Sequence, residues 1–334
     1  MSKTHHGSAR FLVKTALAAT ALLLLSACAG GGGGEAVSSA GTKTTLELSV
    51  GTLPFSTLAP FHIADEEGRF KDAGLTIKTH EAASGAAQVA ALMAGDIDIT
   101  YTNFVTAFQA SQQGLPVQIF LVNDLGSTGK DLNSGLMVEP GSPIQKPADL
   151  KGKKIAINSL GAVMEMTTRR IMEDAGVGEG DYELVEIPPP NMIAALDGGQ
   201  VDAAWIAEPF LTIGIQSSGL RQVAPAFYGR TAGIPQSGWV TTKQFAEKNQ
   251  EALASFTTVM KQVLEESTAD KAQAKVKEAI PTFTDISADV AGKFTYLDFD
   301  PANDLDGLPK LQDEMIRYKI LDGPVDLEQL VFKP

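Results

Sequence analysis

Short runs typical of β-strands alternate with helical runs from Leu46 onward. The segment LELSV (46–50) alternates apolar and polar residues, as a half-buried strand does. Further strand-like runs follow at 75–78, 97–100 and 117–122, with helical runs at 59–70, 84–94 and 103–113. Ser84 and Asn103 stand at expected N-caps, because their side chains can accept a free N–H of the first helical turn. This order predicts α/β units.

The second part of the chain repeats this order. Its strand-like runs are at 154–157, 182–187 and 201–204, and its helical runs at 162–175 and 192–196. AALMAGDID (90–98) also matches AALDGGQVD (194–202), and DAGL (72–75) matches DAGV (174–177) at nearly the same offset. The pattern favours an internal duplication. The alternative is chance similarity between helix–glycine–strand junctions, which use similar residues.

Two similar halves predict two α/β lobes around a cleft. We expect the first lobe at 44–124 plus 238–334 and the second at 125–237, with loop-like crossings at 123–129 and 233–237. An amphipathic stretch at 243–266 and 271–279 predicts C-terminal helices that brace the lobes. Ligands of open α/β sheets bind beyond the carboxyl ends of the strands, so the cleft is the expected site.

Residues 1–27 have the pattern of a bacterial signal peptide. Lys3, Arg10 and Lys14 give a basic start, and the apolar stretch that follows is shorter than the roughly 20 residues of a membrane-spanning helix. The stretch ends in LSAC, where Cys28, the single cysteine, stands as in a lipobox. We predict lipidation of Cys28, a flexible tether at 28–43 and an extracytoplasmic, membrane-anchored protein. The alternatives are an ordinary secretory signal and a short membrane anchor.

Composition narrows the possible functions. The 334 residues are 44% hydrophobic and 20% charged, an ordinary globular composition for about two domains. The net charge is −13, with no basic cluster beyond the N-terminus. This balance excludes a nucleic-acid partner, because a phosphate backbone needs a dense cationic face.

Catalytic and metal-binding patterns are missing from the sequence. His5 and His6 lie in the signal segment, His62 lies in a helical run and His80 follows a strand. The sequence has no HExxH, GxSxG or GxxxxGK[ST] motif, and Cys28 is its only thiol. We therefore expect no enzyme activity, no metal and no cofactor.

Strand-end loops hold the candidate ligand contacts. They lie at 55–57, 83–85 and 101–103 in the first half, and at 159–161, 188–191 and 205–209 in the second. Several stand directly before a helix, where free N–H groups and a Ser or Asn side chain suit a polar or anionic group. Phe55, Tyr101 and Trp205 can supply apolar walls. The alternatives are helix caps for Ser84 and Asn103, and a core position for Trp205.

Four segments together resemble a known family. LPFSTLAPFHIADEEGRFKDAGLTIK, SGAAQVAALMAGDIDI, DLKGKKIAI and AALDGGQVDAAWIAEPF look like the nitrate-, sulfonate- and taurine-type substrate-binding proteins of ABC importers. That family also includes binders of the thiamine pyrimidine precursor. The likeness spans about residues 45–240. It implies the type II periplasmic-binding-protein fold, in which two lobes close on a ligand by a hinge.

The resemblance also implies the function and the site. The chain is expected to capture a small organic solute and deliver it to an ABC permease, as a monomer and without catalysis. The ligand contacts that it points to are Phe55, Ser56, Ser84, Gly85, Thr102, Asn103, Ser159, Gly161, Asn191, Trp205 and Glu208.

The ligand itself stays open among several classes. Because these loops hold no Lys or Arg, free phosphate or sulfate is disfavoured. A monoanionic sulfonate, ranked first, a zwitterion whose ammonium meets Glu208, or a neutral pyrimidine stacked on Trp205 would fit. Two other functions remain as alternatives: a lipoprotein that senses a ligand and signals to a receptor, and an enzyme on the same fold. Pyrimidine-precursor synthases need a cysteine-rich iron motif, which a single cysteine cannot provide.

Overall fold

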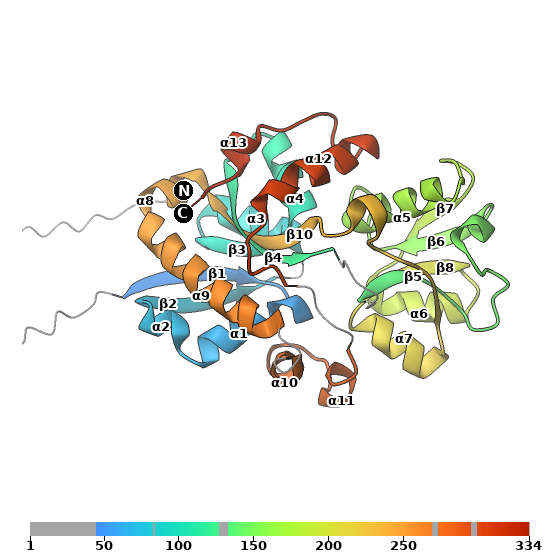
Figure 1. The fold of residues 1–334 in the computed structure, drawn as a ribbon, viewed down its shortest axis with the longest axis horizontal. Coiled ribbons are helices and arrows are strands. Elements are labelled where there is room, and N and C mark those ends of the chain that lie inside the picture. Colours follow the sequence, from blue (N-terminus) through green and yellow to red (C-terminus); the bar gives the residue numbers. More distant parts are fainter. Residues whose placement is uncertain (1–44, 83, 127–132, 269–272, 295–298, 334) are drawn as a thin grey trace, which may run out of the picture. The chain divides into compact units, whose positions relative to one another are not determined.

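Two five-stranded sheets organise the part of the chain that the structure describes (Figure 1). The structure is a computed structural model and describes residues 45–82, 84–126, 133–268, 273–294 and 299–333. The predicted signal segment, the lipidation of Cys28 and the tether lie outside these residues. The prediction of a mixed α/β fold is confirmed.

The first sheet has the strand order β2-β1-β3-β10-β4. Its strands are β1 (Leu46–Thr52), β2 (Leu75–Glu81), β3 (Ile99–Asn103), β4 (Val117–Leu125) and β10 (Pro235–Thr242). β1 pairs in parallel with β2 and β3, whereas β10 runs antiparallel between β3 and β4. A strand from late in the chain therefore completes a sheet built from its first part.

The second sheet, ordered β7-β6-β8-β5-β9, has the same arrangement. Its strands are β5 (Ser134–Val138), β6 (Lys154–Ile157), β7 (Glu183–Glu186), β8 (Ala203–Ala207) and β9 (Arg221–Pro225). β6 pairs in parallel with β7 and β8, and β5 runs antiparallel between β8 and β9. In both sheets, three parallel strands are thus followed by one antiparallel strand and an edge strand. The boundaries of the two predicted lobes stay a prediction.

Equivalent aspartates support the internal duplication. Asp98 precedes β3, and its carboxylate accepts the backbone N–H of Ser49 on β1 at 2.8 Å. Asp202 precedes β8 and accepts the N–H of Lys154 on β6 at 2.9 Å. These two aspartates are the last residues of the two matching sequence segments. The repeated segment thus makes the same strand-to-strand contact in each half.

Helices cover both faces of the first sheet (Figure 1). One face packs against α1 (Ala59–Glu66), α2 (Arg69–Asp72), α8 (Lys243–Lys248), α9 (Gln250–Thr268), α10 (Gln273–Phe283) and α11 (Ala288–Ala291). The other packs against α3 (Gly85–Ala94), α4 (Phe104–Gln112), α12 (Leu308–Arg317) and α13 (Leu327–Leu330). The predicted C-terminal helices are therefore present and bury their apolar sides on this sheet.

The second sheet lies between α5 (Val163–Asp174) on one face and α6 (Pro189–Asp197) and α7 (Phe210–Ser218) on the other. Alternate residues of β8 serve the two faces, with Trp205 toward α5 and Ile206 toward α6 and α7. Met166 of α5 is buried among apolar residues of the first sheet's helices. Every helix among the described residues is too short or too polar to cross a bilayer.

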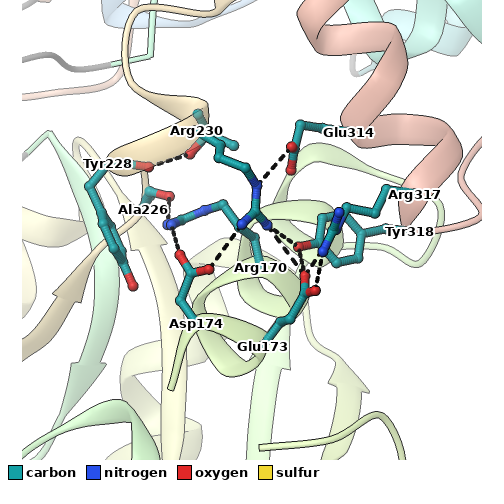
Figure 2. Close-up of polar contacts among 10 residues, drawn as sticks. Arg170, Glu173, Asp174, Ala226, Tyr228, Arg230, Glu314, Arg317 and Tyr318 are labelled. Atoms are coloured by element: carbon teal, nitrogen blue, oxygen red, sulfur yellow. Dashed lines mark hydrogen bonds and ion pairs between the residues drawn. The ribbon is translucent and has the colours of Figure 1, made fainter. Parts of the chain in front are cut away.

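A charged network links α5 to α12 through the chain between β9 and β10 (Figure 2). Arg230 lies in that connection and donates to Glu314 of α12 at 3.0 Å and to Asp174 of α5 at 3.2 Å. Arg170 is fully buried beneath it and donates to the Asp174 carboxylate at 2.8 Å. Elements that pack on different sheets are thus joined beside one of the two crossings.

Several predicted element boundaries are wrong. The helix expected at 59–70 divides into α1 and α2, because Gly68 adopts a left-handed conformation with φ 72°. The crossing expected at 123–129 begins too early, since β4 continues to Leu125 with Asn123 and Asp124 buried. The crossing expected at 233–237 ends too late, because β10 starts at Pro235. The helix expected at 243–266 divides into α8 and α9 at Asn249.

Two central strands extend into loops that were expected to hold ligand contacts. β3 reaches Asn103 and β8 reaches Ala207. Tyr101, Thr102 and Trp205 therefore belong to strands, not to the strand-end loops in which they were expected. Both strands are central, and the first four residues of each are buried whether polar or apolar, so no switch to exposed polar residues marks the end of the strand.

Candidate functional site

A cavity of about 220 Å³ lies between the two sheets, where their parallel strands end. From the first sheet and its loops it is lined by Phe55, Ser56, Thr57, Tyr101, Asn103, Asp124, Gln236 and Ser237. From the second it is lined by Asn133, Ser134, Asn158, Ala162, Val163, Met164, Trp205, Ala207 and Glu208. The volume suits a small solute, since pockets for drug-sized ligands hold about 300–1,000 Å³.

Strands that run antiparallel to their neighbours also reach this edge. Ser237 near the start of β10 pairs with Asn103 at the end of β3. Ser134 at the start of β5 pairs with Ala207 at the end of β8. The amino ends of β5 and β10 therefore add hydroxyl groups to the site that the carboxyl ends of parallel strands form.

Hydroxyl groups gathered around Asp124 form the polar side of the cavity. The phenol oxygen of Tyr101 lies 2.7 Å from Thr57 Oγ1 and 2.6 Å from Ser237 Oγ, and it donates to Asp124 Oδ1 at 3.0 Å. Ser237 donates to the same oxygen. Burial and the Asp124 charge raise the pKa of Tyr101 well above its ordinary value. The phenol therefore stays protonated and can donate a hydrogen bond.

Trp205 and the first turn of α5 form the opposite wall. Trp205 is 2% exposed, and its indole N–H donates to Thr167 Oγ1 of α5 at 2.9 Å. The N-cap residue of α5 is Ala162, which has no side-chain acceptor for the free N–H groups of the first turn. The helix start therefore presents backbone donors beside an apolar ring.

Two carboxylates, Asp124 and Glu208, are among the lining residues. Glu208 accepts the backbone N–H of Thr212 at 3.0 Å and its hydroxyl at 2.7 Å, and so binds the start of α7. The described lining residues include no Lys, Arg or His. Binding of a dianion is unfavourable here, because the ion would lose its hydration and no cation of the cavity wall would compensate for that loss.

Five of the sequence-predicted contacts come together in this cavity: Phe55, Ser56, Asn103, Trp205 and Glu208. Asn103 also caps α4, because its Oδ1 accepts the N–H of Thr106 at 2.9 Å. The two interpretations of Asn103, as a helix cap and as a cavity residue, therefore hold together. Whether these residues touch a ligand stays a prediction.

The structure places the other six predicted contacts outside the cavity lining: Ser84, Gly85, Thr102, Ser159, Gly161 and Asn191. Ser84 caps α3, and Gly85 lies against the buried side chain of Thr102. Ser159 is partly buried, and Asn191 is exposed. The carbonyl of Gly161 accepts a hydrogen bond from Gln109 Nε2 at 2.8 Å. These residues stand near strand ends, and their contact with a ligand stays a prediction.

Sequence reasoning missed nine lining residues: Asp124, Asn133, Ser134, Asn158, Ala162, Val163, Met164, Gln236 and Ser237. Thr57 and Ala207 lay in predicted strand-end loops without being selected, and Tyr101 was expected only as an apolar wall. Asp124 had a signal, because it directly follows the apolar run 117–122 and Asn123 and so lies near the carboxyl end of that strand. Ser134 and Ser237 had none, since the direction of β5 and β10 depends on pairing with distant strands.

No group of three His, Cys, Asp or Glu side chains that could hold a metal ion is present in the described part of the chain. His62 is stacked on Phe283, with ring centroids 3.9 Å apart, and burial lowers its pKa to about 4. It packs between α1 and α10, away from the cavity lining. His62 is therefore a packing residue.

The chain is similar to known binding proteins. A family model described as NMT1/THI5 like matches residues 56–274, more than half of the chain. The taurine-binding periplasmic protein of Escherichia coli (strain K12) is 29% identical over 208 residues, which cover 61% of this chain and 62% of that protein. A putative aliphatic sulfonates-binding protein of Bacillus subtilis (strain 168) is 24% identical over 311 residues, 88% of each. The chain thus spans less than two thirds of the first relative and most of the second.

Solved structures share the fold. The periplasmic aliphatic sulphonate binding protein SsuA from Escherichia coli has a TM-score of 0.72 at 19% identity, covering 85% of this chain and 96% of that one. The periplasmic nitrate-binding protein NrtA from Synechocystis PCC 6803 has a TM-score of 0.67 at 14% identity, covering 86% of each. At these identities the likeness concerns the fold alone. It confirms the predicted periplasmic-binding-protein fold.

Proposed function

Because the chain belongs to the NMT1/THI5-like family, we propose that it is the solute-binding protein of an ABC importer. It captures a small organic solute between its two lobes and passes it to the permease, and it catalyses no reaction. The observation that carries this proposal is the cavity lined from both sheets. A ligand that touches both lobes binds the closed arrangement more tightly than an open one and so shifts the protein toward it.

The protein works outside the cytoplasmic membrane in this proposal. The lipid on Cys28 holds it there, and the tether at 28–43 lets a monomer reach its permease. The signal-like segment before Cys28 and the periplasmic relatives support this location.

The cavity favours a ligand of the sulfonate or taurine type. Backbone donors at the start of α5 suit a singly charged sulfonate, and the methylenes of the ligand would lie along Trp205. The Glu208 carboxylate, which also lines the cavity, suits an ammonium group, as in a zwitterionic aminosulfonate. The binding proteins named for taurine and for aliphatic sulfonates, which are similar in sequence, support the same class.

A neutral pyrimidine of the thiamine-precursor type is the second candidate. The observation that favours it is Trp205, whose ring lines a cavity rich in neutral hydroxyl and amide groups. A lipoprotein that reports its ligand to a receptor would need the same cavity. Loss of solute uptake on deletion of the gene separates transport from signalling.

The test is a thermal-shift and calorimetric screen of the soluble chain from Ser38 onward. The probes are taurine, ethanesulfonate, nitrate and an aminopyrimidine. A ligand at 100 times its dissociation constant raises the free energy of unfolding by about 2.7 kcal/mol, which is readily measured. Trp205→Ala and Glu208→Gln test the cavity, and Ser217→Ala, exposed on α7, is the control.

The outcomes separate the ligand classes. If Glu208→Gln weakens the binding of taurine but leaves the binding of ethanesulfonate unchanged, the ligand is an aminosulfonate. Equal binding of both, unaffected by Glu208→Gln, identifies a plain sulfonate. Binding of the pyrimidine alone supports the second candidate. Folded protein that binds none of these probes overturns the proposed ligand class.

A further inference from the structure

Thr167 lies directly behind the cavity without lining it. It stands on α5, its side chain is fully buried, and it connects two parts of the cavity wall. Its Oγ1 accepts the indole N–H of Trp205 at 2.9 Å. The same hydroxyl donates to the backbone carbonyl of Val163, one turn earlier, at 2.9 Å. Val163 and Trp205 both line the cavity.

The chemistry of the hydroxyl makes this connection directional. A threonine hydroxyl has one proton to donate, and an indole N–H can only donate. The Thr167 hydroxyl therefore donates its proton to the Val163 carbonyl, and a lone pair of its oxygen accepts the indole N–H of Trp205. The ring on β8 is thereby fixed relative to the first turn of α5, where the cavity presents its backbone donors.

The other tryptophan of the chain shows that burial alone does not demand this bond. Trp239 lies in the first sheet, is fully buried, and its Nε1 has no hydrogen-bond partner among the described residues. Packing holds that ring between Phe61 and Phe256. A partner for the indole N–H is therefore a particular property of the tryptophan at the cavity.

We propose that Thr167 is a positioning residue, which fixes the indole of Trp205 in the cavity wall and thereby sets the affinity for ligands that lie on it. The effect on affinity rests on the proposed solute-binding function, whereas the effect on the indole does not. Thr167 acts through Trp205 and Val163 and touches no ligand itself.

The chain offers a matched control in the next residue. Thr168 is on the same helix and is also fully buried, but its Oγ1 has no hydrogen-bond partner in the described part of the chain. Thr167→Val and Thr168→Val remove the same atom and keep nearly the same shape. Only the first variant leaves the Trp205 N–H without an acceptor. Thr167→Ser restores the hydroxyl.

The first measurement needs no ligand. The sequence has two tryptophans, so the full chain labelled with [15N]tryptophan gives two indole N–H signals, which Trp205→Phe assigns. We expect Thr167→Val to move the Trp205 signal and to leave the Trp239 signal in place. Thr168→Val and Thr167→Ser should leave both signals near their original positions. An unmoved Trp205 signal in Thr167→Val overturns the proposal.

The second measurement is the affinity for taurine and ethanesulfonate by calorimetry. We expect Thr167→Val to bind about tenfold more weakly, and Thr168→Val and Thr167→Ser to stay within about threefold of the original chain. A moved indole signal with unchanged affinity overturns the link to binding. If the original chain binds neither probe, the proposed ligand class fails, while the indole signals still decide whether Thr167 positions Trp205.

Discussion

Glu173 near the end of α5 forms an ion pair with Arg317, the last residue of α12 (Figure 2). Arg317 Nε donates to Glu173 Oε2 at 3.1 Å, and the hydroxyl of Tyr318 donates to the same oxygen. α12 packs with the first sheet, whereas α5 covers the second. Arg230 lies 3.3 Å from Glu173 Oε2 and joins the pair to the connection between β9 and β10. The carboxylate thus bridges the two halves beside a crossing.

The stability of the protein should depend on pH through Glu173. The hydrogen bond from Arg317 is the main cause that lowers the pKa of Glu173 from 4.5 to about 2. A lowered pKa in the folded state adds stability above pH 4.5, and that stability is lost as the pH falls toward 2. Because Glu173 is 42% exposed, we expect a contribution of about 1 kcal/mol.

Urea unfolding of Glu173→Gln between pH 7 and pH 3 measures this contribution. The variant should be less stable than the original chain at pH 7, and the difference should shrink steadily below pH 4.5. Glu265→Gln, which removes an exposed carboxylate on α9, is the matched control for the change of charge. A difference that stays constant across the range contradicts the assignment.

Arg170 should be the most costly residue to replace in this network. Its side chain is 0% exposed, donates to Asp174 at 2.8 Å and to the carbonyl of Ala226 at 3.3 Å, and lies 3.7 Å over the Tyr228 ring. We expect Arg170→Met to lower the free energy of unfolding by about 3 kcal/mol. Arg170→Lys should recover less than half of this, because a lysine cannot make the planar stack and both hydrogen bonds. Urea unfolding of both variants decides the point.

The sequence was a good guide where local chemistry decides the structure. Ser84 and Asn103 do cap α3 and α4, since a cap depends only on residues within one turn. Asn123 and Asp124 misled, because Asn and Asp are depleted in strands. In the fold, Asn123 Nδ2 donates to the carbonyl of Thr57 at 2.9 Å, and the Asp124 carboxylate accepts hydrogen bonds from the hydroxyls of Tyr101 and Ser237. These distant partners make a strand of residues that are typical of a loop.

The site was predicted in its location but only partly in its residues. The carboxyl-end rule found Phe55 and Glu208, which follow parallel strands, and Trp205, which lies within β8 two residues before its end. It could not separate residues that face the cavity from neighbours that face away. Tyr101 and Thr102 are consecutive on β3, so their side chains point to opposite faces, and only Tyr101 reaches the cavity. The register that decides this is fixed by pairing with β10, more than a hundred residues later.

Gly238 should be essential for the shape of the cavity. It follows a register irregularity in β10, and a Cβ at this position would lie 2.1 Å from the carbonyl oxygen of Leu121 on β4. The backbone of β4 cannot move aside at low energetic cost. We therefore expect Gly238→Ala to lower the free energy of unfolding by about 3 kcal/mol. The shift of β10 should also displace Ser237 and weaken ligand binding. Gly141→Ala, where a Cβ meets nothing within 4 Å, should change neither quantity.

Two helix caps offer a test that separates stability from recognition. Ser84 and Asn103 play the same structural role, each accepting a backbone N–H at the start of its helix, at 3.2 Å and 2.9 Å. Only Asn103 lines the cavity. Replacing either by alanine should lower the free energy of unfolding by about 1 kcal/mol, because one helical N–H loses its acceptor.

The ligand affinities of the two cap variants should differ. Asn103→Ala removes an amide from the cavity wall and should weaken binding of the solute by about tenfold, whereas Ser84→Ala should leave binding unchanged. Calorimetry with whichever probe binds the original chain measures both affinities. The two variants can be compared directly, because both should lose about the same stability. Equal affinity in both variants would show that Asn103 serves α4 alone. Weakened binding in Ser84→Ala would instead mean that the start of α3 reaches the ligand, as the family resemblance implies.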